Sequence, residues 1–153
     1  MSCCNPHNRY RAAVPFAIVA GLAIVAGGLI AATIAHNPTQ PLVWMVAYLV
    51  LVVGVAQLGF GIGQAFLADD APSTGRVRIQ FVFFNAGNAG VIAGTLLEWF
   101  PLVAASALFL AVALALFFYG VRNARRGWQL YAYWLLLSVI FTGALVGVML
   151  SAT

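Results

Sequence analysis

The amino terminus of this chain carries its best candidates for metal ligands. Cys3, Cys4 and His7 lie within the short segment CCNPH. Two thiolates and an imidazole suit copper(I) or zinc. Adjacent cysteines, however, cannot turn both sulfur atoms toward one ion as easily as a C-x-x-C pair can, and chain termini are often disordered. We therefore expect no metal here and interpret the two cysteines as reduced thiols without a role.

A second group of polar side chains consists of carboxamides within apolar sequence. They are Gln57 and Gln64, followed by Gln80, Asn85 and Asn88 in and before the segment FNAGNAG (84–90). Carboxamides offer donors and acceptors without charge, so they can bond one another across helices or line a hydrated path or a small polar site. We favour bonding across two antiparallel helices, with Gln64 level with Gln80, Gln57 level with Asn88, and Asn85 between them.

The composition of the chain decides which elements must position these side chains. Hydrophobic residues make up 64% of it and charged residues 7%, which leaves too little polar surface to cover a water-soluble domain. Within a bilayer every backbone polar group needs an internal partner, and a spanning helix needs about 20 mostly apolar residues. We predict an all-α integral membrane protein, a single membrane domain over residues 1–153, with the lipid bilayer as its first partner.

Apolar stretches of spanning length define the expected helices. They cover approximately residues 12–35, 42–67, 79–99, 101–119 and 128–151. The third and fourth stretches nearly touch, but Glu98, Trp99 and Pro101 place a charge, an interfacial aromatic ring and a helix-starting proline at the join. A tight hairpin is therefore expected there, and the whole chain is predicted to be a five-transmembrane-helix bundle.

The basic residues predict the orientation of the bundle. All seven are arginines: Arg9, Arg11, Arg76, Arg78, Arg122, Arg125 and Arg126. With five spans, the three segments that carry them fall on one side of the membrane, which the positive-inside rule assigns to the cytoplasm. The N-terminus is then inside and the C-terminus outside, in what we expect to be a prokaryotic cytoplasmic membrane. This topology accounts for the net charge of +4, so we expect no nucleic acid partner.

The predicted spans lack the ionisable residues that membrane-embedded chemistry usually uses. Asp69, Asp70 and Glu98 lie at span ends, and His36 lies in a loop. A proton relay, a carboxylate site for sodium or a bis-histidine haem site would need groups that these spans do not contain. We therefore predict a protein that is not an enzyme and that has no cofactor.

Small residues recur at helical spacing along the predicted spans. The glycines that we expect to support helix packing are Gly59, Gly61, Gly63, Gly87, Gly90, Gly94, Gly143 and Gly147. Small side chains allow close approach of helix backbones in a membrane. These glycines predict close packing, either within the bundle or between protomers.

The segment 57–97 resembles paired helices in the catalytic subunits of haem–copper oxidases and their smaller relatives. The resemblance rests on Gly59, Gly61 and Gly63, on RVRIQ (76–80), and on Asn85, Gly87, Asn88 and Gly94. Members of that family hold haem through intramembrane histidines. Here Gln80 stands where a ligand would be expected, and no predicted span contains histidine. The resemblance therefore implies a haem-free, degenerate relative.

These observations lead to three functional hypotheses. The first is a non-catalytic accessory or scaffolding subunit of a membrane complex, or a homo-oligomer, whose partners are other membrane subunits or copies of itself. The second is a channel or carrier for a small neutral solute or gas, lined by the carboxamides of the second and third spans. The third is a redox subunit like those of the haem–copper oxidases.

Overall fold

The computed structural model describes residues 6–68, 72–124 and 127–151, and it describes side chains from Tyr10 onward. The helices are α1 (Pro6–Ile34), α2 (Gln40–Tyr48), η1 (Leu49–Ala56), α3 (Gln57–Leu67), α4 (Thr74–Leu96), α5 (Phe100–Val121) and α6 (Trp128–Ser151). Because α2, η1 and α3 follow one another without a break, they form one rod. The described residues thus contain five helical rods long and apolar enough to cross a membrane, and no strand. The prediction of an all-helical chain with five such helices is confirmed.

Several helix boundaries differ from the predicted ones, with α1 starting at Pro6 instead of residue 12, and two of the differences have a clear local cause. The third rod begins at Thr74, not at residue 79, because the Ser73 side chain accepts a 3.4 Å hydrogen bond from the backbone N–H of Arg76 and caps an earlier turn. The second rod begins at Gln40, with a proline in its first turn, where proline is favoured. Hydropathy locates the apolar part of a helix but not the polar turn that precedes it.

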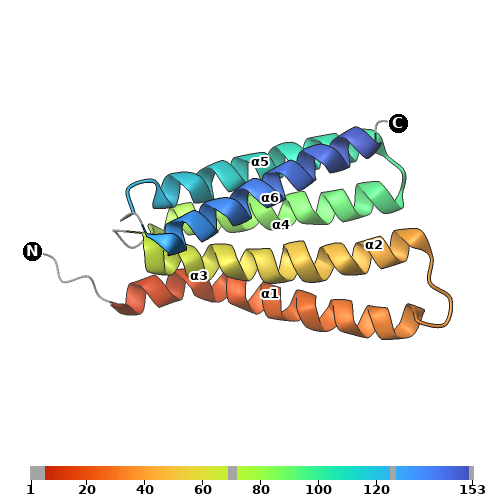
Figure 1. The fold of residues 1–153 in the computed structure, drawn as a ribbon, viewed down its shortest axis with the longest axis horizontal. Helices are drawn as coiled ribbons and strands as arrows, with labels where there is room; N and C mark the ends of the chain where they lie inside the picture. Colours follow the sequence, from red (N-terminus) through yellow and green to blue (C-terminus); the bar gives the residue numbers. More distant parts are fainter. Residues whose placement is uncertain (1–5, 69–71, 125–126, 152–153) are drawn as a thin grey trace, which may run out of the picture.

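The chain folds as two hairpins and a returning helix. Figure 1 shows α1 beside the α2–η1–α3 rod, α4 beside α5, and α6 running back along the second hairpin. The start of α1 and the end of α6 lie at opposite ends of the bundle in Figure 1, as an odd number of spans requires.

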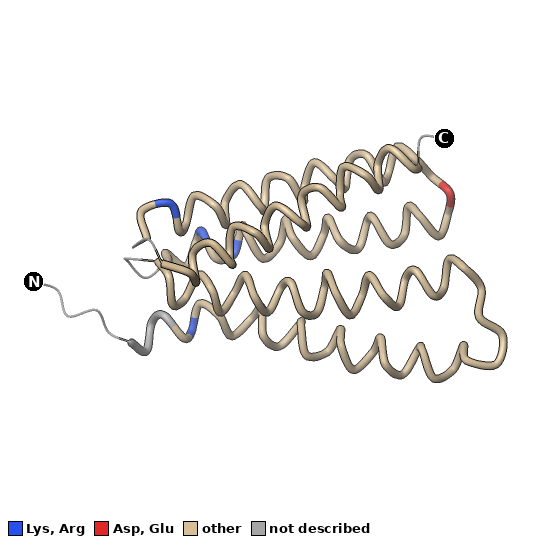
Figure 2. Tube along the Cα trace, viewed as in Figure 1, with Lys and Arg blue, Asp and Glu red and all other residues tan. Residues whose placement is uncertain are grey.

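The charged residues of the described part of the chain lie at the two ends of the bundle. Figure 2 shows the described arginines, which are Arg11, Arg76, Arg78 and Arg122, in blue toward the end where α1 begins, and the described acidic residue, Glu98, in red at the other end. We refer to these as the arginine end and the Glu98 end. The apolar helices run between them, which is the arrangement that the predicted topology requires. Which end faces the cytoplasm stays a prediction.

The α4–α5 connection is the tight hairpin that the sequence predicts. The backbone N–H of Trp99 donates to the carbonyl of Gly94 over 2.8 Å, and that of Glu98 donates to the carbonyl of Thr95 over 3.3 Å. This pair of bonds is a Schellman motif, which places its C′ residue in the left-handed region. Glu98 occupies that position with a φ of 53°, and α5 starts two residues later.

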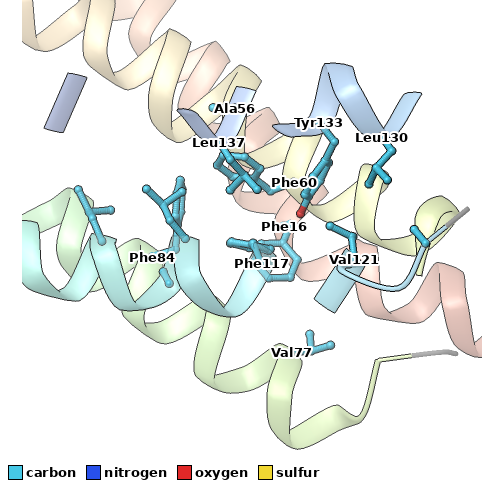
Figure 3. Packing of buried hydrophobic residues seen from close by; sticks show 14 residues of the cluster. Phe16, Ala56, Phe60, Val77, Phe84, Phe117, Val121, Leu130, Tyr133 and Leu137 are labelled. Carbon is cyan, nitrogen blue, oxygen red and sulfur yellow. The ribbon is translucent and has the colours of Figure 1, made fainter. Parts of the chain in front are cut away.

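Phenylalanine side chains from four helices fill the interior. Phe16 of α1, Phe60 of α3, Phe84 of α4 and Phe117 of α5 are almost completely buried. Phe117 stacks on Phe60 with ring centroids 5.0 Å apart and meets Phe16 edge-on at 5.5 Å. Figure 3 shows this cluster with Tyr133 and Leu137 of α6 above it. The middle of the bundle is therefore closed by packed rings.

Candidate functional site

Four of the five predicted carboxamides are buried in the bundle. The exposed fraction is 0% for Gln57 and Gln80, 1% for Asn88 and 3% for Gln64. Asn85 is half-buried, and its Nδ2 donates to the backbone carbonyl of Phe81 in its own helix over 2.8 Å. The carboxamides thus lie inside the fold, as expected, and their partners decide what they can do.

Asn88 has two partners, neither of which is Gln57. Its Oδ1 accepts a 2.8 Å hydrogen bond from the Tyr48 hydroxyl, and its Nδ2 donates to the backbone carbonyl of Phe84 over 2.8 Å. The expected pairing of Gln57 with Asn88 is wrong, since both polar atoms of Gln57 lack a hydrogen-bond partner among the described residues. Sequence reasoning missed Tyr48. The available signal was a tyrosine within an apolar run, away from the membrane interface where this residue is usually found.

Gln64 and Gln80 approach adjacent turns of α5. Nε2 of Gln80 donates to the backbone carbonyl of Leu116 over 3.1 Å. One turn further on, a Cβ atom at Gly120 would lie 2.8 Å from Nε2 of Gln64, so glycine makes room for that side chain. Both glutamines lie against α5, but they are not bonded as a pair: Nε2 of Gln64 and Oε1 of Gln80 have no partner in the described chain.

The misassigned pairs have one physical cause. We expected the second and third rods to pack together because they are consecutive, whereas α4 packs mainly on α5, and η1 and α3 pack mainly on α1. Small residues allow both contacts. Gly87 and Gly94 of α4 lie against Leu110 and Val103 of α5, and Gly61 of α3 lies against Phe16.

The same glycine contacts place the remaining predicted packing residues. Gly90 lies against Ser106 of α5, Gly59 lies against Leu136, and Gly63 lies against the ring of Tyr133. The last two contacts hold the first half of α6 on α3. Close approach of helices at glycine is the usual means of packing in membrane proteins.

A π-helical segment separates Tyr48 from Gln57. Nine residues make two and a half turns of an α-helix, so these side chains would otherwise lie on opposite faces of the rod. The eight residues of η1 have wider turns, which reduces that angle. As a result, Tyr48 reaches Asn88 on α4 while Gln57 is also turned inward and fully buried. Short π-helical segments are frequent at functional sites.

A groove lies between the second rod and α6, on the half of the bundle nearer the Glu98 end. Its volume is about 610 Å³. One wall runs from Gln40 to Val52 and the other from Val139 to Ser151, and α4 and α5 form its floor. Its lining contains no charged side chain and none of the five predicted carboxamides. The groove and the buried carboxamides are therefore different features, and they meet at Tyr48, which lines the groove and donates to Asn88.

The groove exists because the second half of α6 is not packed closely against the neighbouring helices. The buried residues of α6 are Leu130, Tyr133 and Leu137, all in its first ten positions. From Ser138 to Ser151 no residue is buried, and a Cβ atom at Gly143 or Gly147 would have no neighbour within 4 Å. Of the two alternatives expected for these glycines, packing within the bundle is not found among the described residues, because α6 diverges from its neighbours before it reaches them. Packing between protomers stays a prediction.

Two further groups of residues have no assembled site in the described chain. Cys3 and Cys4 lie outside the described residues, as does the side chain of His7, so the metal prediction is not tested there. Elsewhere in the described part, no three His, Cys, Asp or Glu residues come together as metal ligands. At the arginine end, the guanidinium group of Arg122 lies 3.9 Å from the centre of the Tyr119 ring, and that of Arg76 lies 5.8 Å from it.

Comparison with protein-family models, with curated proteins and with solved structures finds no match to this chain. The resemblance of segment 57–97 to haem–copper oxidase subunits stays a prediction. Gln80, the residue that stands at an expected ligand position, donates a hydrogen bond to Leu116 and is fully buried.

Proposed function

We propose that this chain is a non-catalytic multi-pass membrane protein whose working surface is the groove between the second rod and α6. In this proposal the arginine end faces the cytoplasm, and the groove opens sideways into the outer leaflet. The protein then acts by holding a hydrophobic molecule or segment within the bilayer.

The observation that carries the proposal is the contrast between the groove and the rest of the bundle. Near the arginine end α6 is held on α3 at Gly59 and Gly63, whereas near the Glu98 end it leaves about 610 Å³ unfilled. Ligand pockets in proteins have volumes of about 300 to 1,000 Å³ and are mostly apolar, with a few polar groups. The groove has this character, with Tyr48 and Thr95 among its few polar residues.

Permeation through the carboxamides has less support. The buried carboxamides Gln57, Gln64 and Gln80 belong to α3 and α4, which also contribute Phe60 and Phe84 to the phenylalanine cluster, and Phe60, Phe84 and Phe117 are each 0% exposed. A neutral solute would have to displace these rings. The unpartnered carboxamide atoms fit internal hydration of the fold better than a continuous path.

The groove makes a direct experimental prediction. The purified protein should bind a fluorophore with a single alkyl chain at one saturable site. Gly143→Phe should abolish this binding, because its ring would enter the groove. Val146→Phe is the matched control, since Val146 is on α6 but does not line the groove. Binding that never saturates, or that survives Gly143→Phe unchanged, would overturn the proposal.

Assembly with other membrane subunits or with itself is the second candidate function. It is favoured by Gly143 and Gly147, which lie four residues apart and have no neighbour within 4 Å. The mass of the purified protein in a mild detergent tests it. A dimer, or a complex with a second protein, that dissociates in Gly147→Leu but not in Val146→Leu would support assembly through α6.

A further inference from the structure

We infer that the groove holds one membrane lipid, with an acyl tail between α2 and α6 and an uncharged or zwitterionic head group at the Glu98 end. This inference rests on the proposed function and specifies its ligand. Three features of the groove carry it, namely its length, its closed end and its charge.

The length of the groove matches one leaflet. Its wall on the second rod runs from Gln40 to Val52, and its wall on α6 runs from Val139 to Ser151. The twelve α-helical steps from Val139 to Ser151 rise about 18 Å, whereas half of a hydrocarbon core is about 15 Å thick. The groove therefore extends from the head-group level to about the middle of the bilayer, which is the extent of a lipid tail in one leaflet.

The groove stops where α6 meets α3. This closed end favours a lipid tail over a partner helix as the occupant of the groove. Leu136 lies over Gly59 and Tyr133 over Gly63, so the two helices touch through the half nearer the arginine end. A partner helix about 10 Å wide and 30 Å long would occupy roughly 2,400 Å³. Such a helix would have to cross the closed half, and the groove of about 610 Å³ would receive only one row of its side chains.

Hydrocarbon is also the medium that surrounds an open apolar groove in a membrane. Water would find few polar partners among Leu51, Val91 and Ile140, and an empty space would leave these side chains without van der Waals contacts. A lipid tail restores those contacts at the cost of its own ordering. No other component of a bilayer is present at a comparable concentration.

The residues at the open end indicate the class of head group. Gln40, Thr95 and Ser151 line the groove there, and Glu98 is the charged residue that the structure describes at that end. The amide of Gln40 and the hydroxyl of Thr95 can bond a phosphate or glycerol oxygen, whereas the Ser151 hydroxyl already donates to the carbonyl of Gly147 in its own helix over 2.7 Å. A carboxylate at the same end of the bundle disfavours net negative charge. The arginines, which would attract an anionic lipid, lie at the opposite end.

Tryptophan fluorescence can test both the tail and the head group. Trp44 lines the groove, whereas Trp128 is 77% exposed at the arginine end. Two variants that each keep one of these as the sole tryptophan are reconstituted into phosphatidylcholine vesicles that contain a small fraction of lipid with brominated tails. Bromine quenches tryptophan fluorescence at contact. Quenching stronger than that expected for random mixing of the lipids therefore indicates a lipid that is retained beside the tryptophan.

We expect excess quenching of Trp44 by brominated phosphatidylcholine, and the loss of that excess in Gly147→Leu but not in Val146→Leu. Brominated phosphatidylglycerol should show no excess at Trp44 and should favour Trp128. If quenching of Trp44 is no greater than random mixing of the lipids predicts, the inference of a bound lipid is wrong. The proposed function of the groove would still hold in that case if the protein binds the alkyl fluorophore and Gly143→Phe abolishes that binding. Excess quenching by the anionic lipid alone overturns the head-group class.

Discussion

The hydroxyl group of Tyr48 donates a 2.8 Å hydrogen bond to Oδ1 of Asn88 and so connects the two hairpins of the bundle. Tyr48 ends α2, and Asn88 lies in the middle of α4. Because Nδ2 of Asn88 also donates to the carbonyl of Phe84, both the oxygen and the nitrogen of this buried carboxamide have a hydrogen-bond partner. Gln57, equally buried, has none among the described residues.

The Tyr48–Asn88 bond predicts energetic coupling between the hairpins. Tyr48→Phe and Asn88→Leu should each lower the free energy of unfolding, by about 1 kcal/mol, because each leaves one polar group unpaired. The double variant should lose less than the sum, with a coupling of about 0.6 kcal/mol, the average for bonds between membrane helices. Denaturant unfolding in detergent gives the free energy of unfolding of the unmodified protein, of the two single variants and of the double variant.

Tyr131→Phe is the control for this cycle, since Tyr131 is an exposed tyrosine of α6. It should change the free energy of unfolding little and should show no coupling to Asn88→Leu. If the losses of Tyr48→Phe and Asn88→Leu simply add, the bond makes no contribution in the folded protein.

Gln57→Leu should have the opposite effect to Asn88→Leu. A buried carboxamide without partners costs about 1 to 3 kcal/mol in desolvation, and leucine fills a similar volume without that cost. We expect the melting temperature to be unchanged or higher for Gln57→Leu and lower for Asn88→Leu. A loss in Gln57→Leu as large as that in Asn88→Leu would mean that Gln57 is hydrogen-bonded in the membrane, for example through an internal water molecule.

The sequence is sufficient to predict the elements of this fold because they depend on local properties. Runs of apolar residues locate all five helices, and the residues Glu98 to Pro101 locate the tight hairpin. The placement of arginines also predicts that one end of the bundle collects them. None of these features depends on which helices are neighbours.

The contacts between helices depend on information that spacing does not contain. Gly90 and Gly94 have the same four-residue spacing as Gly143 and Gly147, yet the first pair meets α5 and the second meets nothing. Likewise, Gln64 and Gln80 do not bond as a pair, because α3 packs mainly on α1 whereas α4 packs mainly on α5. The π-helical turns of η1 and the groove beside α6 also arise from tertiary packing.

The covered and uncovered glycines predict contrasting effects of adding a methyl group. At Gly87 a Cβ atom would lie 3.0 Å from the backbone nitrogen of Leu110 and 3.0 Å from the backbone oxygen of Ser106, and neither atom can move freely. Gly87→Ala should therefore separate α4 from α5 and lower stability by about 1 to 3 kcal/mol.

Gly21→Ala is the matched control, because nothing lies within 4 Å of a Cβ atom at Gly21. This change should leave stability unchanged or raise it by up to about 1 kcal/mol through helix propensity. Thermal unfolding in detergent compares the two variants. Equal effects at both positions would contradict the close α4–α5 contact.

The proposed orientation predicts the activity of reporter fusions. A reporter that is active only outside the cytoplasm should be active after Thr153 and silent when inserted between residues 68 and 72. A cytoplasmic reporter should show the reverse pattern. Replacing Arg76 and Arg78 by asparagine should weaken this asymmetry, because these two charges contribute to the positive-inside signal. The opposite pattern in the unmodified chain would mean that the arginine end faces outward.

Glu98 predicts a gain of stability at the α4–α5 hairpin. Its φ of 53° lies in the left-handed region, which costs a residue with a Cβ atom about 1 kcal/mol relative to glycine. Glu98→Gly should therefore raise the free energy of unfolding by about 0.5 to 1 kcal/mol while the Trp99–Gly94 bond of the Schellman motif is kept. Glu98→Ala is the control, since it removes the same charge but keeps the Cβ atom, and it should give no gain. If alanine stabilises the protein as much as glycine does, the charge of Glu98 and not its backbone conformation is the source of the cost.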